Sequence, residues 1–330
     1  MKAMIAFTHR ISRSALLAVC ALPLATATLA ADFPAKPVRI VTPFPPGGSV
    51  DLVARLLGND LGKAWGRQVI VDNRPGASGN IGTEAAKNAP PDGHTLLVNT
   101  LPFVTNQFVY AKMPYDPIAD FAPISLVSSI AGLLVVHPSL PVRNVRDLVA
   151  LARTRPGALN YGTAGPATNP HISGELLNYL GKINIVAVHY KGGGAATTAT
   201  VSGEIQVFFS NTIPDALPLV QAGRLRALGV TSLKRVPSAP DIPTLAESGL
   251  PGYEFTSWHV LAAPAGTPRA LIAQINEKVR SLLGTPEAVQ HWRERGVEVI
   301  ASTPEEAAAH LKKEIAKWRV VFKERGMKAE

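Results

Sequence analysis

Residues 38–51 read VRIVTPFPPGGSVD, the most informative run of the chain. The apolar run at 39–42 is typical of a buried strand, the Pro/Gly-rich run after it is typical of a turn, and a helix is expected to begin at Ser49. Glycine lets the backbone approach a ligand closely, and the first turn of a helix presents unpaired N–H groups and a positive dipole end. The stretch therefore predicts either an ordinary strand–turn–helix connection or an anion-binding turn that needs no Arg or Lys.

The first 31 residues have the pattern of a secretory signal peptide. Lys2, Arg10 and Arg13 precede an apolar segment, 14–24, that is too short to span a bilayer, and small residues follow it. Cleavage is expected at Ala30 or Ala31. A lipoprotein signal at Cys20 is the alternative, which the bulky residue before that cysteine disfavours. Cys20 is the only cysteine, so the mature chain is expected to have no disulfide and no thiol chemistry.

The length and charge of the mature chain limit its possible functions. Removal of residues 1–31 leaves 299 of the 330 residues, enough for two domains at roughly 150 residues each. It also removes three basic residues and no acidic one, which lowers the formal charge from +9 to +6. Aromatic residues are few and are not interleaved with the basic ones, so binding to nucleic acid is not expected. The basic surface is interpreted as a solvated one that modestly assists the capture of anions.

Predicted strands and helices alternate along almost the whole chain, which indicates an α/β protein with largely parallel sheets. Two similar passages, 134–138 and 260–264, each consist of an apolar strand stopped by proline ahead of a helix. They are interpreted as connections between two lobes. Residues 125–250 are then an inserted second lobe, and residues 32–124 plus 251–330 form the first.

Several predicted strands end in small or hydroxyl-bearing residues just before a helix. Ligands of open parallel sheets bind outside the carboxyl ends of the strands, so these turns predict a cleft suited to a small carboxylate. The expected ligand-binding residues are Phe44, Pro46, Gly47, Gly48, Ser49, Asp51, Asn99, Thr100, Thr163, Ala164, Gly165, Thr168, His171, Lys191, Gly192 and Ser210.

The roles of four residues stay open at this level. Asp51 could cap the helix or brace the loop, and Lys191 could pair with a ligand or lie at the rim of the cleft. His171 could contact the ligand or serve the first turn of its helix. Trp258 could line the cleft or pack in the core, and a core position is favoured.

Enzymatic function is not expected. Residues 76–79 are one residue short of a G-x-S-x-G elbow, and Gly192–Gly194 do not complete a dinucleotide-binding fingerprint. No P-loop is present, and no histidine pairs with another histidine or a carboxylate at the spacing of metal ligands. We therefore predict no catalytic residue, no metal site and no cofactor.

The mature chain resembles, over its whole length, the Bug family of periplasmic solute-binding proteins, the receptor components of tripartite tricarboxylate transporters. The resemblance rests on many ordered matches: Phe33–Arg39, Pro43–Gly48 with Asp51, Ala54 and Arg55, Asn73–Ala77, Pro91–Leu97, Asp120–Ile124, Tyr190–Gly192, Leu225–Leu228, Pro240–Thr244 and Ala263–Pro268. It implies a two-lobed, type II-like periplasmic-binding-protein fold that closes on its ligand. It implies a periplasmic location and a carboxylate held by backbone N–H groups, hydroxyls and bridging waters. It also implies delivery of that ligand to the membrane subunits of a transporter.

Two features of the chain bear on what the receptor would bind. Ser210 stands where the family commonly has an acidic residue, and a neutral hydroxyl suits a second carboxylate, or a neutral ligand body, better than an ammonium group. His259 stands where glycine is common. The ligand stays open among dicarboxylates, tricarboxylates, aromatic carboxylates and amino acids, and a monomer is expected. The alternatives are a receptor that reports ligand to a signalling partner and, less favoured, a secreted hydrolase.

Overall fold

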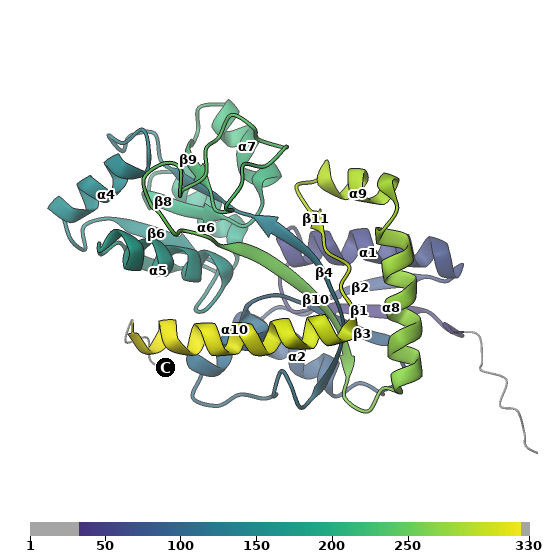
Figure 1. The fold of residues 1–330 in the computed structure, drawn as a ribbon. Coiled ribbons are helices and arrows are strands. Elements are labelled where there is room, and N and C mark those ends of the chain that lie inside the picture. Colours follow the sequence, from purple (N-terminus) through teal and green to yellow (C-terminus); the bar gives the residue numbers. More distant parts are fainter. Residues whose placement is uncertain (1–32, 325–330) are drawn as a thin grey trace, which may run out of the picture.

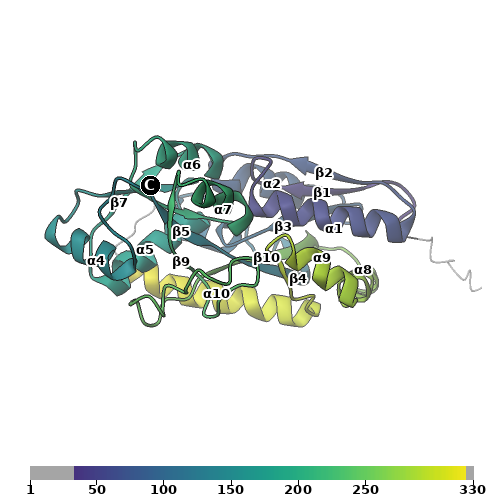
Figure 2. The ribbon, with the colours of Figure 1, turned by 90° about the horizontal axis from the view of Figure 1, so that it is seen from above.

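The protein consists of two α/β lobes side by side, each built on one β-sheet flanked by helices (Figures 1 and 2). The structure is a computed structural model that describes residues 33–324, so the expected signal peptide lies outside the described residues. Within residues 33–324, no helix combines the length and apolar character that crossing a membrane requires.

The first sheet has six strands in the order β11-β4-β10-β3-β1-β2. Their bounds are Val38–Thr42 for β1, Val69–Asn73 for β2, Thr95–Asn99 for β3, Phe121–Ala131 for β4, Thr256–Pro264 for β10 and Glu298–Val299 for β11. The helices of this lobe are α1 (Ser49–Trp65), α2 (Asn80–Lys87), α3 (Pro102–Thr105), α8 (Arg269–Leu283), α9 (Pro286–Arg293) and α10 (Pro304–Glu324), with short 3₁₀ turns η1 (Ala77–Gly79) and η2 (Asn106–Phe108).

The second sheet has five strands in the order β7-β6-β8-β5-β9. Their bounds are Leu133–Val136 for β5, Asn160–Thr163 for β6, Val186–His189 for β7, Val207–Ser210 for β8 and Arg226–Val230 for β9. The helices of this lobe are α4 (Val145–Thr154), α5 (Asn169–Gly181), α6 (Gly193–Val201) and α7 (Ile213–Gln221).

The two-lobed α/β class is confirmed, but the prediction of mostly parallel sheets is wrong, because both sheets are mixed. Strand β1 pairs in parallel with β2 and β3, as β6 does with β7 and β8. In contrast, β10 is antiparallel to β3 and β4, and β5 is antiparallel to β8 and β9. The chain leaves the first sheet along β4 and returns along β10, so these neighbours must run in opposite directions.

The two sheets are joined at Gly132 and Thr231. Strand β4 passes through Gly132 directly into β5, and a Cβ at Gly132 would lie 2.7 Å from the carbonyl oxygen of Ser210. The Gly132 N–H donates to the Thr231 hydroxyl at 2.8 Å, and the Phe255 N–H donates to the Thr231 carbonyl at 2.9 Å just before β10 begins. The lobe boundaries at 124/125 and 250/251 stay a prediction, and β4 runs across the first of them.

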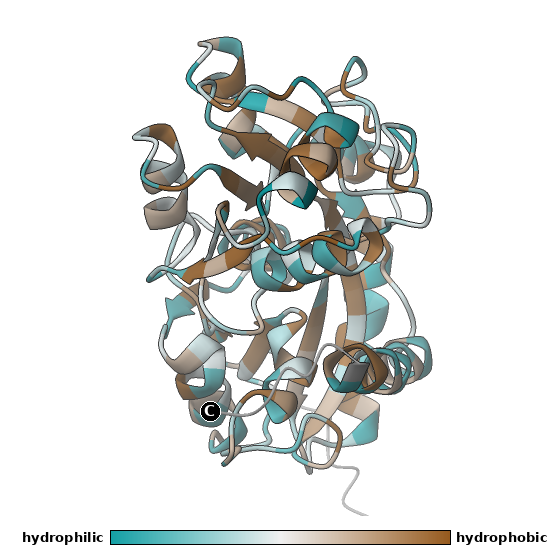
Figure 3. Ribbon diagram, turned by 90° about the vertical axis from the view of Figure 1, so that its left-hand side faces the viewer, coloured by the Kyte–Doolittle hydropathy of each residue, from teal (hydrophilic) through white to brown (hydrophobic). Residues whose placement is uncertain are grey.

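Apolar residues of both sheets are covered by helices whose outer faces are polar (Figure 3). Trp258 of β10 is buried, and its indole N–H donates to the Glu314 carboxylate of α10 at 3.1 Å. Helix α10 therefore packs against β10, the strand that returns from the second lobe, and this bond holds the two together. Trp258 belongs to the core, as favoured from the sequence.

Gly174 of α5 lies against the ring of Tyr161 on β6, and a Cβ at Gly174 would overlap that ring. We expect Gly174→Ala to lower the free energy of unfolding by about 1–3 kcal/mol, because the packed ring cannot move aside without strain. Gly194→Ala is the matched control, since no atom lies within 4 Å of the Cβ position there. Urea denaturation measures both, and equal stability of the two variants would contradict this packing.

Candidate functional site

A cavity of about 950 Å³ lies between the two lobes, where the carboxyl ends of strands from both sheets meet. Its wall in the first lobe is formed by the β1–α1 loop, the loop that precedes α2, and residues near α3. Its wall in the second lobe is formed by the β6–α5, β7–α6 and β8–α7 turns. The cavity therefore lies outside the carboxyl ends of the strands, where the sequence indicated a ligand site.

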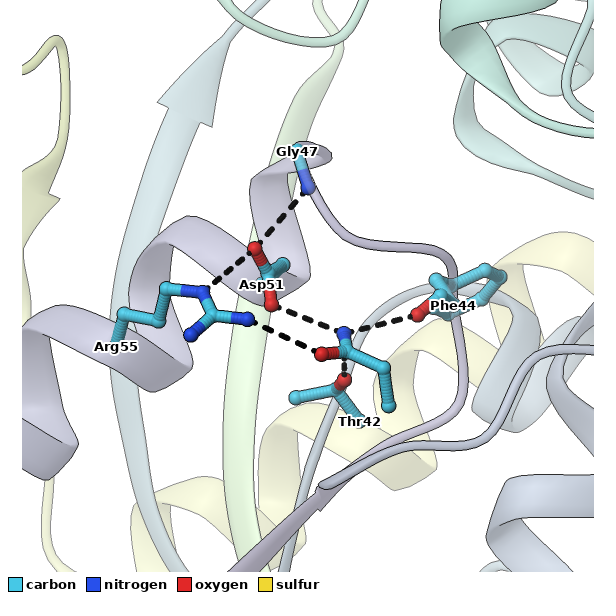
Figure 4. Close-up of polar contacts among 6 residues, drawn as sticks. Thr42, Phe44, Gly47, Asp51 and Arg55 are labelled. Carbon is cyan, nitrogen blue, oxygen red and sulfur yellow. Dashed lines mark hydrogen bonds and ion pairs between the residues drawn. The ribbon is translucent and has the colours of Figure 1, made fainter. Parts of the chain in front are cut away.

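The β1–α1 loop is braced from behind by Asp51. One carboxylate oxygen accepts from the Gly47 N–H at 3.0 Å and from Arg55 Nε at 2.9 Å, and the other accepts from Asn73 Nδ2 at 2.9 Å. Asn73 Nδ2 also donates to the Thr42 hydroxyl and to the Phe44 carbonyl (Figure 4). Both ends of the Pro-rich loop are therefore tied to one carboxylate–amide pair, with Gly47 turned at a φ of +87°.

Asp51 stays ionised because of these bonds. Burial alone would raise the pKa of this carboxyl, but the hydrogen bonds from Arg55, Gly47 and Asn73 outweigh it and hold the pKa below its ordinary value. The charge of Asp51 is directed at the loop backbone and Arg55, so Asp51 lies behind the cavity wall and does not line the cavity.

Helices α2, α3 and α7, with Gly79, Pro102 and Asp215 at or near their starts, reach the cavity without a side-chain cap from the described residues. So do α1, α5 and α6, which carry the lining amides considered next. The first backbone donors inside these helices are Leu52, Ile172 and Ala196, which donate to the N-cap carbonyls. The amides ahead of them are the orphan donors of each helix. Those that line the cavity are Ser49 and Val50 of α1, Asn169 of α5, and Gly193, Gly194 and Ala195 of α6.

Helices away from the cavity are capped differently. Asn144 accepts from the Asp147 N–H at the start of α4, and Thr285 accepts from the Ala288 N–H at the start of α9. Thr303 and Glu306 form a reciprocal capping box at α10. Helix α8, which starts after Pro268, is uncapped although it does not line the cavity. The uncapped starts of α1, α5 and α6 give the cavity a positive potential without requiring many cationic side chains.

The β6–α5 turn is shaped by side chains behind it. The Thr163 hydroxyl accepts from the Gly165 N–H at 3.1 Å and lies 2.6 Å from His189 Nδ1. His171 Nδ1 accepts from the Ala167 N–H at 3.0 Å, so this ring nitrogen carries no proton. Burial, with His189 beside it, lowers the pKa of His171 to about 4, so the ring is neutral at neutral pH.

The lobes are in contact through a buried polar cluster at the floor of the cavity. The Thr100 hydroxyl donates its single proton to the Trp258 carbonyl at 2.6 Å, so it can only accept from Asn169 Nδ2 at 3.3 Å. This fixes the orientation of the Asn169 amide, whose Nδ2 also bonds the Ser257 hydroxyl. The Thr105 hydroxyl lies 3.1 Å from the Leu101 carbonyl of its own lobe and 3.3 Å from the Ala167 carbonyl of the other, so its single proton is shared between them.

Most of the residues proposed from the sequence lie together at the cavity. Those that line it are Phe44, Pro46, Gly47, Gly48, Ser49, Thr100, Ala164, Gly165, Thr168, Lys191, Gly192 and Ser210. Asp51, Asn99, Thr163 and His171 lie one layer behind, where they bond the backbone of the lining loops or of Thr100. Their role as ligand contacts stays a prediction that this placement does not favour.

The sequence interpretation missed a third wall, residues 75–79. This loop follows β2, lines the cavity, and has positive φ angles at Ala77 and Ser78 as well as at its glycines. The rule that ligands bind outside the carboxyl ends of parallel strands, applied to β2, could have found this loop. Tyr110, Tyr190, Phe208, Asn211 and Asp215 also line the cavity, and no local sequence pattern marks their side chains as facing it.

The chemistry of the cavity is that of anion binding. Within residues 33–324, no group of three His, Cys, Asp or Glu residues is placed to hold a metal ion. The lining offers backbone N–H groups, the hydroxyl of Ser49 and the exposed cation Lys191 as donors. The Thr100 and Thr168 hydroxyls already donate to backbone carbonyls, and the one carboxylate among the described lining residues is that of Asp215.

Comparison with known proteins gives consistent results. The family model described as "Tripartite tricarboxylate transporter family receptor" matches residues 53–327. BugT of Bordetella pertussis is 32% identical over 95% of this chain and 98% of its own length. The structure of R. palustris Rpa4515 with adipate is 37% identical, with a TM-score of 0.86 over 91% of this chain and all of that one. MatC of Rhodopseudomonas palustris with bound malate is 31% identical, with a TM-score of 0.80 over 88% of this chain and 99% of that one.

The brace on the β1–α1 loop predicts a pH dependence of stability. Asp51→Asn should lower the free energy of unfolding at pH 7 by about 1–3 kcal/mol, because a neutral amide cannot accept from all three donors. The pKa of Asp51 is lowered in the folded protein, so its contribution is fully present above its ordinary value of 3.8 and is lost as pH falls through the folded value. Denaturation curves between pH 7 and pH 3 should show the gap between wild type and variant closing below pH 3.8, and a constant gap would contradict the brace.

Proposed function

The chain belongs to the Bug family of tripartite tricarboxylate transporter receptors, and on that premise we propose that it captures a small organic carboxylate in the cavity between its lobes. The carboxylate is held by backbone N–H groups at the starts of α1, α5 and α6, by hydroxyls and by bridging waters. The captured ligand is delivered to the membrane subunits of a tripartite transporter. The protein acts in the periplasm as a monomer and catalyses no reaction.

The observation that carries this proposal is the set of unpaired helix starts that line one cavity from both lobes. Buried N–H groups cost free energy unless a partner accepts from them, and a carboxylate is an acceptor with four lone-pair positions. The adipate and malate named for the two solved relatives support the same ligand class here.

The split of the donors between the lobes links binding to closure. Helix α1 belongs to the first lobe, whereas α5 and α6 belong to the second. A carboxylate ligand that reaches both sets has its full affinity only when the lobes are together. It therefore shifts the equilibrium toward the closed form by its differential affinity for that form.

Thermal unfolding of purified residues 32–330 with a panel of carboxylates tests the function. A ligand at 100 times its Kd should stabilise the protein by about 2.7 kcal/mol, because it binds only the folded state. Stabilisation by one chemical class of carboxylate is expected. If no carboxylate shifts the melting temperature, and mass spectrometry of the denatured protein finds no co-purified acid, the proposed function is wrong.

Transport is tested in cells. Deleting the membrane subunits of the cognate transporter should abolish uptake of the carboxylate identified above, while the purified receptor still binds it. Unchanged uptake would favour a signalling receptor.

Gly48 provides a direct test of the backbone donors. Its φ of −89° is close to what proline adopts, so Gly48→Pro should fold while removing the N–H and restricting the loop. We expect carboxylate binding to weaken by at least roughly 10- to 100-fold, the effect of losing a hydrogen bond to a charged group. Gly48→Ala keeps the N–H and has only the Pro45 carbonyl, at 3.9 Å, near its Cβ, so it serves as the control. Calorimetry that finds equal affinity for both variants would argue against this site.

A further inference from the structure

The aromatic residues that line the cavity differ from those elsewhere in the protein. Within residues 33–324, every phenylalanine and tyrosine makes a ring contact with another aromatic or histidine ring, except five. Four of these five line the cavity: Phe44, Tyr110, Tyr190 and Phe208. The fifth, Tyr179, is 47% exposed on the surface of α5.

The two cavity tyrosines are each anchored by a hydrogen bond from the hydroxyl group. Tyr110 donates to the Ser78 hydroxyl at 3.1 Å, and Tyr190 donates to the Glu204 carboxylate at 2.8 Å. These bonds hold the phenol groups in place. Phe208 contributes an almost fully buried ring from β8, and Phe44 contributes a half-buried ring from the β1–α1 loop.

The two lobes already touch each other beside the cavity, so its volume is measured with the lobes in contact. The buried Asn169–Thr100 bond already joins them, and so do two close approaches of glycine backbone. A Cβ at Gly165 would lie 3.2 Å from the Ser78 hydroxyl, and one at Gly192 would lie 3.5 Å from Pro45 Cγ. The lobes therefore have little room to approach further, and the cavity keeps a volume of about 950 Å³.

A cavity of this size is at the upper end of the range for small-molecule sites, which is roughly 300–1,000 Å³. Any small diacid, linear or aromatic, would share this volume with several waters, at about 30 Å³ for each water. Six prolines line it, at 43, 45, 46, 75, 102 and 166, and they add apolar surface to its walls.

We infer that the ligand is an aromatic carboxylate, whose ring packs among Phe44, Tyr110, Tyr190 and Phe208 while its carboxylate is bound at the helix starts. This inference rests on the proposed function and names its substrate class. The unpartnered rings supply the edge-to-face or offset contacts that aromatic pairs prefer. A rigid aromatic acid also loses less conformational entropy on binding than a flexible chain does.

Three diacids serve as the probe series: terephthalate, trans-cyclohexane-1,4-dicarboxylate and adipate. The first two share their ring size and carboxylate spacing, so they differ in aromatic character and ring shape. We expect terephthalate to bind more tightly than its saturated analogue by roughly 5- to 50-fold, which corresponds to one or two aromatic contacts. Calorimetry with the wild-type protein measures all three.

Ring-deleting variants assign the preference to the cavity. Tyr190→Leu should reduce terephthalate affinity by roughly 2- to 10-fold and should reduce adipate affinity less. Tyr190→Phe keeps the ring and should retain the preference. Tyr179→Leu removes the unpartnered ring outside the cavity and should change nothing. Phe44→Leu repeats the test from the opposite lobe.

The outcomes are distinct. Tighter binding of terephthalate that falls in Tyr190→Leu and Phe44→Leu but not in Tyr179→Leu supports the inference. Binding of adipate without a preference for the aromatic acid overturns the inference and leaves the proposed function intact. Binding of none of these acids, or of any other carboxylate in the thermal panel, overturns both.

Discussion

The unpaired backbone N–H groups at the starts of α1, α5 and α6 are the feature on which the rest of the site depends. The amides of Ser49, Val50 and Asn169 belong to buried residues, so they need acceptors inside the cavity, whereas Gly194 and Ala195 of α6 are exposed. Side chains that could have capped these helices face elsewhere: Thr168, for example, donates its hydroxyl to the Gly165 carbonyl. The surrounding residues keep the donors in position, as Asp51 does by tying Gly47 and Asn73 together behind the β1–α1 loop.

The mixed sheets follow from the division of the chain into two lobes. For the chain to insert a second lobe and return, β4 and β10 must run antiparallel at the centre of the first sheet. These two strands connect the lobes, and the Gly132 N–H, just after β4, donates to the Thr231 hydroxyl, just after β9. The buried Asn169–Thr100 contact lies at the floor of the cavity, so the geometry that joins the lobes also sets the volume open to a ligand.

The sequence alone was sufficient for the class of fold, for most elements and for the turns with glycine at the end of a strand. It indicated a strand at 39–42 and a helix that begins at Ser49, and the structure has β1 at Val38–Thr42 and α1 from Ser49. It was wrong about strand direction, because direction depends on which strands become neighbours, and apolar periodicity does not record that. It could not separate residues that line the cavity from those that brace it: Asp51 and His171 sit near the turns in sequence but bond the backbone from behind. Tyr110 and Phe208 reach the cavity only through tertiary packing.

The central claim is that backbone amides at helix starts hold the carboxylate. Titration of ¹⁵N-labelled protein with the carboxylate that stabilises it most, followed by amide ¹H–¹⁵N spectra, tests this claim most directly. The largest downfield amide proton shifts are expected at Ser49, Asn169 and Gly193, because N–H protons move downfield when they bond a charged acceptor. The capped start of α4, at Asp147, should not move. Large shifts confined to other surfaces, with Ser49, Asn169 and Gly193 unchanged, would contradict the central claim.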